Sequence, residues 1–163
     1  MTKFMPFVFD DEGFFTNQKC FIMTGEKLYY LVAFFNSFLF KFCFRENFPE
    51  LIGGTRELSK VFFEKIPVKP ITPEQEQPYK EIVKKISALK KADTSADISH
   101  LEAELNQMIY EYYGISEEEQ VFIEETVKGW AEKGVIAVPE LVDCLRLSVP
   151  HYNPRHPVIQ FFT

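Results

Sequence analysis

The sequence lacks the short motifs that identify the commonest enzyme chemistries. It has no glycine-rich phosphate loop, because Gly53-Gly54 is not followed by Lys and then Ser or Thr, and it has no Gly-x-Ser-x-Gly motif. Its three histidines are scattered. The acidic run Glu117–Glu119 fits a helix N-terminus, whose dipole favours negative charge, better than an acid/base pair. We therefore expect no catalytic, cofactor-binding or metal residue in this chain.

Cysteine is also scarce. The chain has only Cys20, Cys43 and Cys144, an odd number with no Cys-x-x-Cys pair and no Cys/His cluster. This pattern argues against a structural zinc site and favours reduced thiols in the cytoplasm. Cys43 lies in an apolar run, which predicts a core position. No secretory signal peptide is expected, because the acidic turn at 10–13 comes before any long apolar stretch.

Hydrophobic residues make up 46% of the 163 residues and charged residues 26%, which is typical of a soluble globular protein. The two halves differ. Fifteen of the 18 phenylalanines lie in residues 1–70, where nine Lys/Arg face eight Asp/Glu. The net charge of residues 1–70 is therefore +1, and that of residues 71–163 is −7, which together give the total of −6. The acidity therefore belongs to the second half and says little about what the first half binds.

Residues 28–44, LYYLVAFFNSFLFKFCF, are apolar or aromatic except at Asn36, Ser37 and Lys41. A membrane span needs about 20 apolar residues with few interruptions, and a lysine within it is costly. We therefore predict one buried helix from Lys27 to about Arg45 and no membrane span. Asn36 and Ser37 either satisfy neighbouring backbone groups or reach a ligand.

The flanking sequence predicts short strands and further helices. Segments 4–9 and 14–24 read as strands that could pair as a hairpin. Capping boxes at Thr72/Gln75 and Ser116/Glu119 begin two helices, and a third helix is expected between them over about 98–113. The predicted fold class is α+β, a small mixed sheet around the buried aromatic-rich helix, followed by an antiparallel helix pair or bundle. The predicted divisions are 1–70, a helical region at 71–134 and an irregular Pro-rich tail at 135–163.

The order of these segments resembles a known family. The strand FFTNQKCFIMTG, the helix LVAFFNSFLFKFCFR, the segment GGTRELSKVFFEKIPV, the helix start PEQEQ and the helix pair that follows resemble the C-terminal Taq-type specificity domain of adenine-N6 DNA methyltransferases and type II restriction–modification enzymes. They also resemble target-recognition domains of type I restriction specificity subunits. The resemblance covers about residues 12–127. Two positions depart from the family pattern, Phe35 for Leu and Lys69 for Pro.

The resemblance implies a DNA target-recognition fragment of a larger enzyme. The catalytic domain would lie upstream and would hold S-adenosylmethionine. The partners implied are double-stranded DNA and the upstream methyltransferase or nuclease part, with a homodimer of the fragment as a further option. A DNA reader needs cations for phosphates and polar side chains for base edges. The first half offers such residues at Thr16, Asn17, Lys19, Arg45, Arg56 and Lys60.

Two alternatives stay open at this point. Arg56 either enters a groove of DNA or is a solvated cation beside Glu57. The chain as a whole is either a DNA-reading fragment or a non-catalytic protein-interaction module made by its acidic helices. If Lys19, Arg45, Arg56 and Lys60 share one concave face, the DNA reading is favoured.

Overall fold

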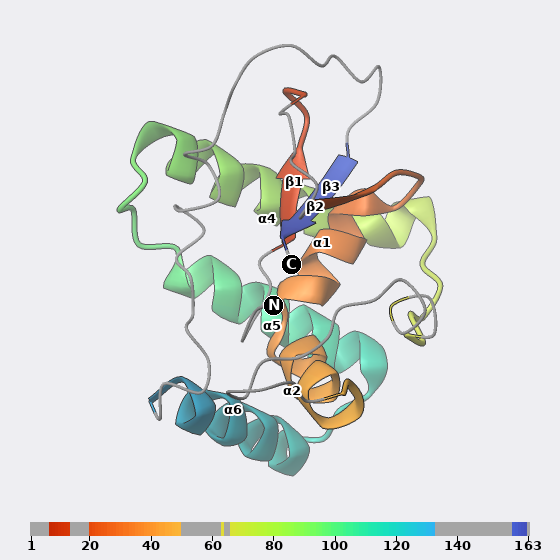
Figure 1. Ribbon diagram of the computed structural model, residues 1–163, viewed down its shortest axis with the longest axis vertical. Coiled ribbons are helices and arrows are strands. Elements are labelled where there is room, and N and C mark those ends of the chain that lie inside the picture. The colour runs from red at the N-terminus through yellow and green to blue at the C-terminus, as the bar shows by residue number, and fades with distance from the viewer. Residues whose placement is uncertain (1–6, 14–19, 50–62, 64–65, 133–157, 163) are drawn as a thin grey trace.

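The computed structural model describes residues 7–13, 20–49, 63, 66–132 and 158–162 (Figure 1). The strands are β1 (Phe7–Asp10), β2 (Cys20–Met23) and β3 (Val158–Phe162). The helices are α1 (Leu28–Asn36), α2 (Phe38–Asn47), α4 (Pro73–Ala92), α5 (Ser99–Tyr113) and α6 (Glu117–Glu132). The predicted α+β fold class is confirmed, with a short sheet beside a buried aromatic helix pair and a helical region that begins at Pro73.

The sheet has a connectivity that the sequence did not predict. Its order is β1-β3-β2, and β3 is antiparallel to both neighbours, with Phe7 opposite Phe161 and Cys20 opposite Phe162. Because both outer strands oppose β3, they run parallel to each other. The predicted hairpin of the first two strands is therefore wrong, and the sheet is antiparallel in both pairings instead of mixed.

The prediction of an irregular tail at 135–163 is also wrong for residues 158–162, which are the part of the tail that the structure describes. Residues 158–162, VIQFF, form β3 at the centre of the sheet. β-Branched and aromatic residues favour a strand, and a central strand satisfies its backbone groups on both sides. The hairpin prediction used only the turn signal at 10–13, which carries no information about a strand from the far end of the chain.

The aromatic run at 28–44 forms two helices instead of the single predicted one. The helical hydrogen bonds stop at Ser37, whose backbone is extended at φ −67° and ψ 157°. The Ser37 hydroxyl donates to the carbonyl of Phe34 at 2.7 Å and accepts from the amide of Phe40 at 3.2 Å. Ser37 thus closes α1 and caps α2, which is the ordinary role of serine at a helix N-terminus.

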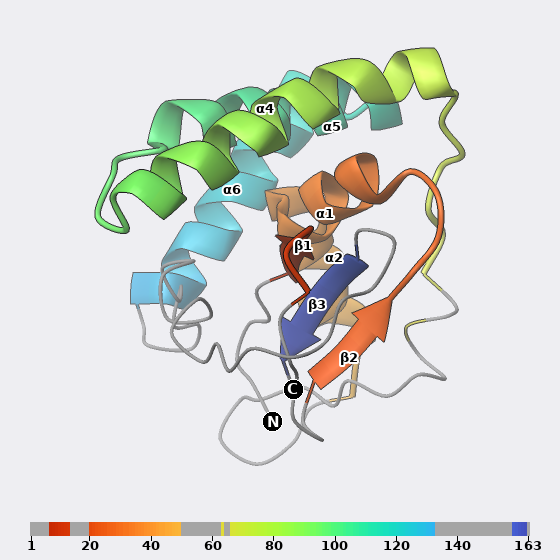
Figure 2. The same ribbon diagram turned by 90° about the horizontal axis from the view of Figure 1, so that it is seen from above.

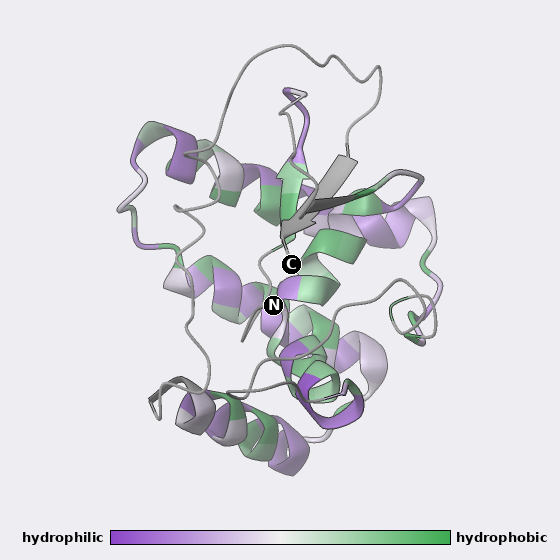
Figure 3. Ribbon diagram, viewed as in Figure 1, coloured by the Kyte–Doolittle hydropathy of each residue, from purple (hydrophilic) through white to green (hydrophobic). Residues whose placement is uncertain are grey.

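Helix α1 lies between the sheet and the α4–α5 pair, as Figure 2 shows. It packs on β1 on one side and on α4 and α5 on the other. Phe7 of β1 stacks on Phe35 at 4.8 Å between ring centroids, and Tyr30 meets Tyr79 of α4 edge-on at 5.4 Å. One hydrophobic core therefore crosses the predicted boundary at residue 70. In Figure 3 the hydrophobic colour is nearly continuous along α1, whereas α4 and α6 alternate with polar residues.

The predicted helix starts of the second half, and the predicted stop at Gly114, are confirmed. Thr72 and Gln75 form a reciprocal capping box at the start of α4. Gly114 ends α5 with a φ of 73°, a left-handed conformation that glycine adopts without strain. The backbone amide of Ser116 donates to the Glu119 carboxylate at 2.8 Å before α6. The predicted end of that helix at Gly134 lies outside the described residues.

Candidate functional site

Of the six predicted DNA-contacting residues, Arg45 is the one that the described structure contains. It lies in the last turn of α2, half-buried, with its guanidinium carbon 4.8 Å from the ring centroid of Trp130 on α6. This cation–π contact joins α2 to α6. Thr16, Asn17, Lys19, Arg56 and Lys60 lie outside the described residues, so the predicted shared basic face lies largely outside them too.

Asn36 satisfies backbone groups, which is one of the two roles left open by the sequence. Its side-chain oxygen accepts from the amide of Phe7 at 3.2 Å, and its amide nitrogen donates to the carbonyl of Phe7 at 2.8 Å. The same nitrogen donates to the carbonyl of Val32 at 2.8 Å. Because both amide hydrogens and the oxygen are used, Asn36 joins β1 to α1 as part of the scaffold.

A second asparagine holds the helix break from the other side. The Asn106 side-chain oxygen on α5 accepts from the amide of Phe38 at 2.7 Å, and its nitrogen donates to the carbonyl of Glu102 at 2.8 Å. The amide of Phe38 belongs to the first turn of α2 and has no partner within that helix. Asn106 is buried. The sequence analysis missed it, although an asparagine beside Leu105 and Ile109 on an inward-facing stripe is an available signal.

The start of α1 is capped by a residue from another helix. Lys27 precedes α1 with a φ of 60° and provides no side-chain cap. Glu76 of α4 instead accepts from the backbone amides of Tyr29 at 3.1 Å and Tyr30 at 3.4 Å. The carboxylate also complements the positive end of the helix dipole. Glu76 and Asn106 therefore tie the helical region to the aromatic helices by polar contacts in addition to the core.

Three tyrosines fix the segment at 66–71, which has no regular secondary structure and contains the Ile-Pro-Val sequence. The hydroxyl of Tyr30 donates to the carbonyl of Lys69 at 3.0 Å and lies 3.0 Å from the hydroxyl of Tyr113. The hydroxyl of Tyr113 accepts from the amide of Lys69 at 3.0 Å, and that of Tyr112 donates to the carbonyl of Pro70. Burial and the Tyr113 hydroxyl hold the pKa of Tyr30 far above its usual value.

A cavity of about 560 Å³ lies where β1 and the α1–α2 break face α4, α5 and α6. Its apolar wall comes from several elements and includes Phe7, Phe9, Val32, Ala33, Val83 and Leu105. Asn36, Ser37 and Asn106 also line it, but they are engaged in the scaffold contacts described above. We call it the junction cavity.

Lysines gather around the junction cavity. The ammonium groups of Lys41 and Lys128 lie 5.1 Å and 5.8 Å from the ring centroid of Phe38. Burial lowers the pKa of Lys41 to about 8, and the charge of Glu102 opposes that effect. The Lys128 ammonium also contacts the Glu124 carboxylate at 2.8 Å, one turn away on α6.

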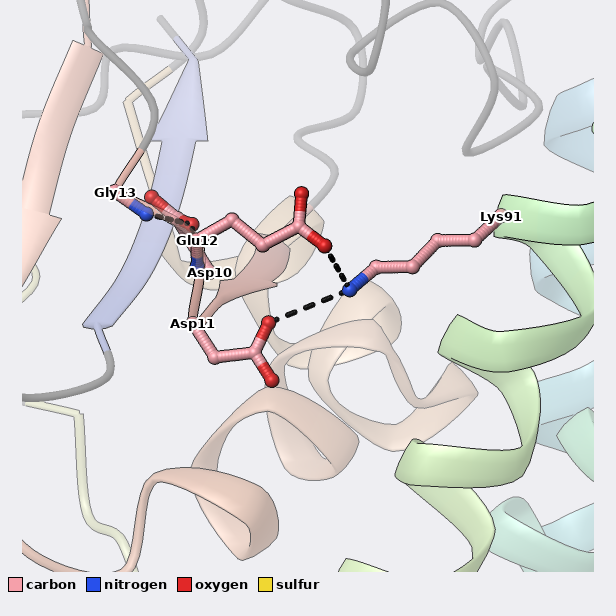
Figure 4. Close-up of polar contacts among 5 residues, drawn as sticks. All are labelled: Asp10, Asp11, Glu12, Gly13 and Lys91. Carbon is pink, nitrogen blue, oxygen red and sulfur yellow. Dashed lines mark hydrogen bonds and ion pairs between the residues drawn. The ribbon is translucent and has the colours of Figure 1, made fainter. Parts of the chain in front are cut away.

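On another part of the same wall, Lys91 at the end of α4 binds the turn after β1 (Figure 4). Its ammonium lies 3.4 Å from a carboxylate oxygen of Asp11 and 2.6 Å from one of Glu12. Hydrogen bonding to Glu12 raises the pKa of Lys91. The turn is held by the buried Asp10 carboxylate, which accepts from the amides of Glu12 at 2.8 Å and Gly13 at 2.9 Å.

Other kinds of site are not found in the part of the chain that the structure describes. Within it, no group of three His, Cys, Asp or Glu side chains is placed to hold a metal ion. No described helix has the length and apolar character needed to cross a bilayer. Cys43, predicted as a core residue, is exposed on α2 instead. The break at Ser37 sets the orientation of α2 independently of α1, so the hydrophobicity of the run alone did not determine which positions face inward.

Comparisons of the chain with protein-family models, with curated proteins and with solved structures find no match. The resemblance to target-recognition domains therefore rests on the sequence motifs alone.

Proposed function

We propose that this chain is a DNA target-recognition fragment of an adenine-N6 DNA methyltransferase or a restriction–modification enzyme. In this proposal it binds double-stranded DNA in the cytoplasm and carries out no catalysis itself. An upstream catalytic domain or subunit supplies S-adenosylmethionine and the methyl-transfer or cleavage chemistry.

The observation that carries the proposal is that the resembling motifs coincide with the polar joints of the scaffold. Asn36 and Ser37 of the helix motif join α1 to β1 and to α2. Glu76 of the PEQEQ motif caps α1. Lys69, which stands where the family has Pro, is held through a backbone N–H that proline lacks, so this joint is outside the resemblance. Motifs that occur in a fixed order for structural reasons should sit at such joints, which supports reading them as one fold.

Because these motif residues are engaged in the scaffold, DNA reading falls to other side chains. We assign base and phosphate contacts to Thr16, Asn17 and Lys19 before β2 and to Arg56 and Lys60 after α2. Arginine pairs well with guanine and asparagine with adenine in the major groove. Arg45 lies in the last turn of α2 and already contacts Trp130, so we assign it to phosphate contact or to support of the fold.

The direct experiment measures binding of the purified chain to a short fluorescent DNA duplex by anisotropy at several salt concentrations. Binding that weakens steeply with salt supports the proposal, because phosphate contacts release counterions. The same preparation, supplied with S-adenosylmethionine, should transfer no methyl group to adenine. Methylation by this chain alone would contradict the non-catalytic assignment.

One observation favours the second candidate, a protein-interaction module. On α6 the side chains of Val121 and Phe122 are 56% and 61% exposed, and Phe122 lies edge-on to Phe42 at 5.9 Å. Apolar side chains that stand beside each other on the surface are typical of interfaces. This candidate is preferred if the chain binds no DNA at low salt and Phe122→Lys abolishes a complex with the upstream catalytic part.

A further inference from the structure

Helix α6 has apolar side chains that face solvent. The helix lies at one end of the molecule in Figure 1 and packs on α2. Its buried residues Ile123 and Val127 point into the core. Val121 and Phe122 lie on the other side of the helix, and more than half of each side chain is exposed. Large apolar side chains that adjoin each other at the surface are typical of a face that another molecule covers.

This apolar surface continues onto α2 through a row of rings. Phe122 meets Phe42 edge-on at 5.9 Å between ring centroids, and Phe42 stacks on Trp130 at 6.0 Å. Phe42 and Trp130 are half-buried, and the guanidinium of Arg45 already lies on the Trp130 ring. Rings held in this way lose little freedom when a partner binds, which is the property of an interface anchor. We call Phe42, Val121, Phe122 and Trp130 the α6 patch.

The charge beside the α6 patch is negative. Glu118 precedes Phe122 by four residues and Glu125 follows it by three, so both glutamates lie on the same side of the helix as the Phe122 ring. Both are exposed, and neither has an ion-pair partner among the described residues. Lys128, the cation one turn beyond Glu125, is paired with Glu124 at 2.8 Å. The uncompensated charge that a partner would meet is therefore that of two carboxylates.

The spacing of these carboxylates indicates the partner. In a two-fold pairing of α6 with a second copy, antiparallel about Phe122, Glu118 of each copy would lie beside Glu125 of the other, and like charges oppose such a contact. Cations in the same places are attracted instead. Glu118 and Glu125 are seven residues apart, about two helical turns, with Phe122 between them. A helix with Lys or Arg at i and i+7 and apolar residues at i+3 and i+4 matches that pattern.

We propose that the α6 patch docks a basic amphipathic helix of another protein, with the apolar side chains of that helix on Val121 and Phe122 and its cations at Glu118 and Glu125. The proposal rests on the protein-interaction candidate and names the chemistry of the partner. It does not involve the proposed DNA contacts, which belong to segments 14–19 and 50–62.

The probes for the test are two synthetic peptides. One consists of two heptads of Lys-Gln-Ala-Leu-Leu-Gln-Ala, and the other has Glu in place of each Lys. Isothermal titration calorimetry of the whole chain at low salt should give an affinity at least about tenfold higher for the Lys peptide. Trp130 is the only tryptophan of the chain, so a change in its fluorescence should report binding at the patch. No binding of the Lys peptide, or equal affinity for both peptides, overturns the proposal.

Two pairs of variants test whether the peptide binds at the α6 patch. Phe122→Ser should weaken binding of the Lys peptide at least about tenfold, as loss of an aromatic anchor does, whereas Leu89→Ser, at an exposed leucine of α4, should not. Glu125→Gln should lower the preference for the Lys peptide about twofold to fivefold. Glu104→Gln, at an exposed position of α5, changes the net charge equally and should leave the preference intact. A control that behaves like its patch variant contradicts the proposal.

The three proposals can fail separately. DNA anisotropy, measured on the same variants, should not change, because the α6 patch has no part in the proposed DNA contacts. Selective binding of the Lys peptide without a complex with the upstream catalytic part would support the docking surface and reject that part as its partner. A complex with the catalytic part that persists in Phe122→Ser would overturn the docking surface and leave the protein-interaction candidate in place.

Discussion

The side-chain amide of Asn36 pairs with both backbone polar groups of Phe7, accepting from its N–H at 3.2 Å and donating to its carbonyl at 2.8 Å. The asparagine thus occupies the place that a neighbouring strand would take beside β1. Phe7 itself is fully buried and stacks on Phe35. The link between the sheet and the aromatic helices is therefore polar and apolar at the same residue.

Asn36→Leu should destabilise the fold by about 2–4 kcal/mol, because it leaves the buried N–H and carbonyl of Phe7 without these hydrogen bonds. Urea denaturation followed by circular dichroism measures the change. Asn47→Leu is the matched control, since Asn47 is an exposed asparagine with one bond, to the carbonyl of Cys43. Equal effects of the two substitutions would show that the Asn36–Phe7 pairing contributes nothing to stability.

Glu76→Ala should cost about 1 kcal/mol, because the first turn of α1 loses its acceptor and its favourable charge. The comparison is Glu81→Ala, an exposed glutamate of α4 whose contact is with Gln77 on the same helix. Thermal unfolding at neutral pH compares the stability of the Glu76→Ala and Glu81→Ala variants. A Glu81→Ala variant that is less stable than Glu76→Ala would rule out the cap between helices.

Lys41 should give stability a specific pH dependence. Its folded pKa of about 8 lies below the usual value of 10.5, so between these values the unfolded chain binds the proton and the folded protein does not. Stability conferred by neutral Lys41 is therefore present at high pH and is lost as the pH falls through 8. Relative to Lys41→Met, the natural protein should gain about 1–2 kcal/mol between pH 8 and pH 10.

The comparison with Lys41→Met cancels the other groups that titrate in this range. The raised pKa of Cys43 acts in the opposite direction in both proteins. Above pH 10, the raised pKa values of Tyr30 and Tyr79 should lower the stability of both, since the unfolded tyrosines lose protons that the folded ones keep. A difference between the two proteins that is flat from pH 7 to pH 10 would show that the Lys41 ammonium is well solvated.

Local signals in the sequence predicted the helices of the second half well. The capping boxes at Thr72 and Ser116 and the glycine at 114 act within one helical turn, so they can be read without knowledge of the fold. The α+β class followed from these signals together with the strand-like segments at 4–9 and 14–24. The scaffold role of Asn36 was one of two readings that the apolar run allowed.

The features that the sequence did not predict depend on contacts between distant residues. The position of β3 depends on pairing with β1 and β2, and the caps from Glu76 and Asn106 depend on how α4 and α5 pack against α1 and α2. The break at Ser37 lies inside a run with helical hydrophobicity, where a serine could equally face the core within one helix. The junction cavity is lined by residues of β1, α1, α2, α4, α5 and α6, so no local pattern in the sequence predicts it.

Substitution of Arg56 distinguishes a role in recognising DNA bases from a role in supporting the fold. In the enzyme that we propose contains this chain, Arg56→Ala should cost about 1–3 kcal/mol of discrimination at one base pair, because arginine is the side chain best suited to a bidentate contact with guanine. Stability should change by less than about 0.5 kcal/mol. Lys60→Ala is the comparison, and it should weaken binding evenly across target sequences, as loss of a phosphate contact does. Unchanged target selectivity, or loss of folding, would make Arg56 a structural residue.

The salt dependence of DNA binding by the purified chain tests the central claim most directly. Three or four phosphate contacts predict a slope of roughly −3 in log K against log salt concentration, and Lys85→Gln, on the exposed face of α4, should leave that slope unchanged. An affinity that stays constant between low and moderate salt, or no binding at low salt, would contradict DNA recognition and favour a protein-interaction module.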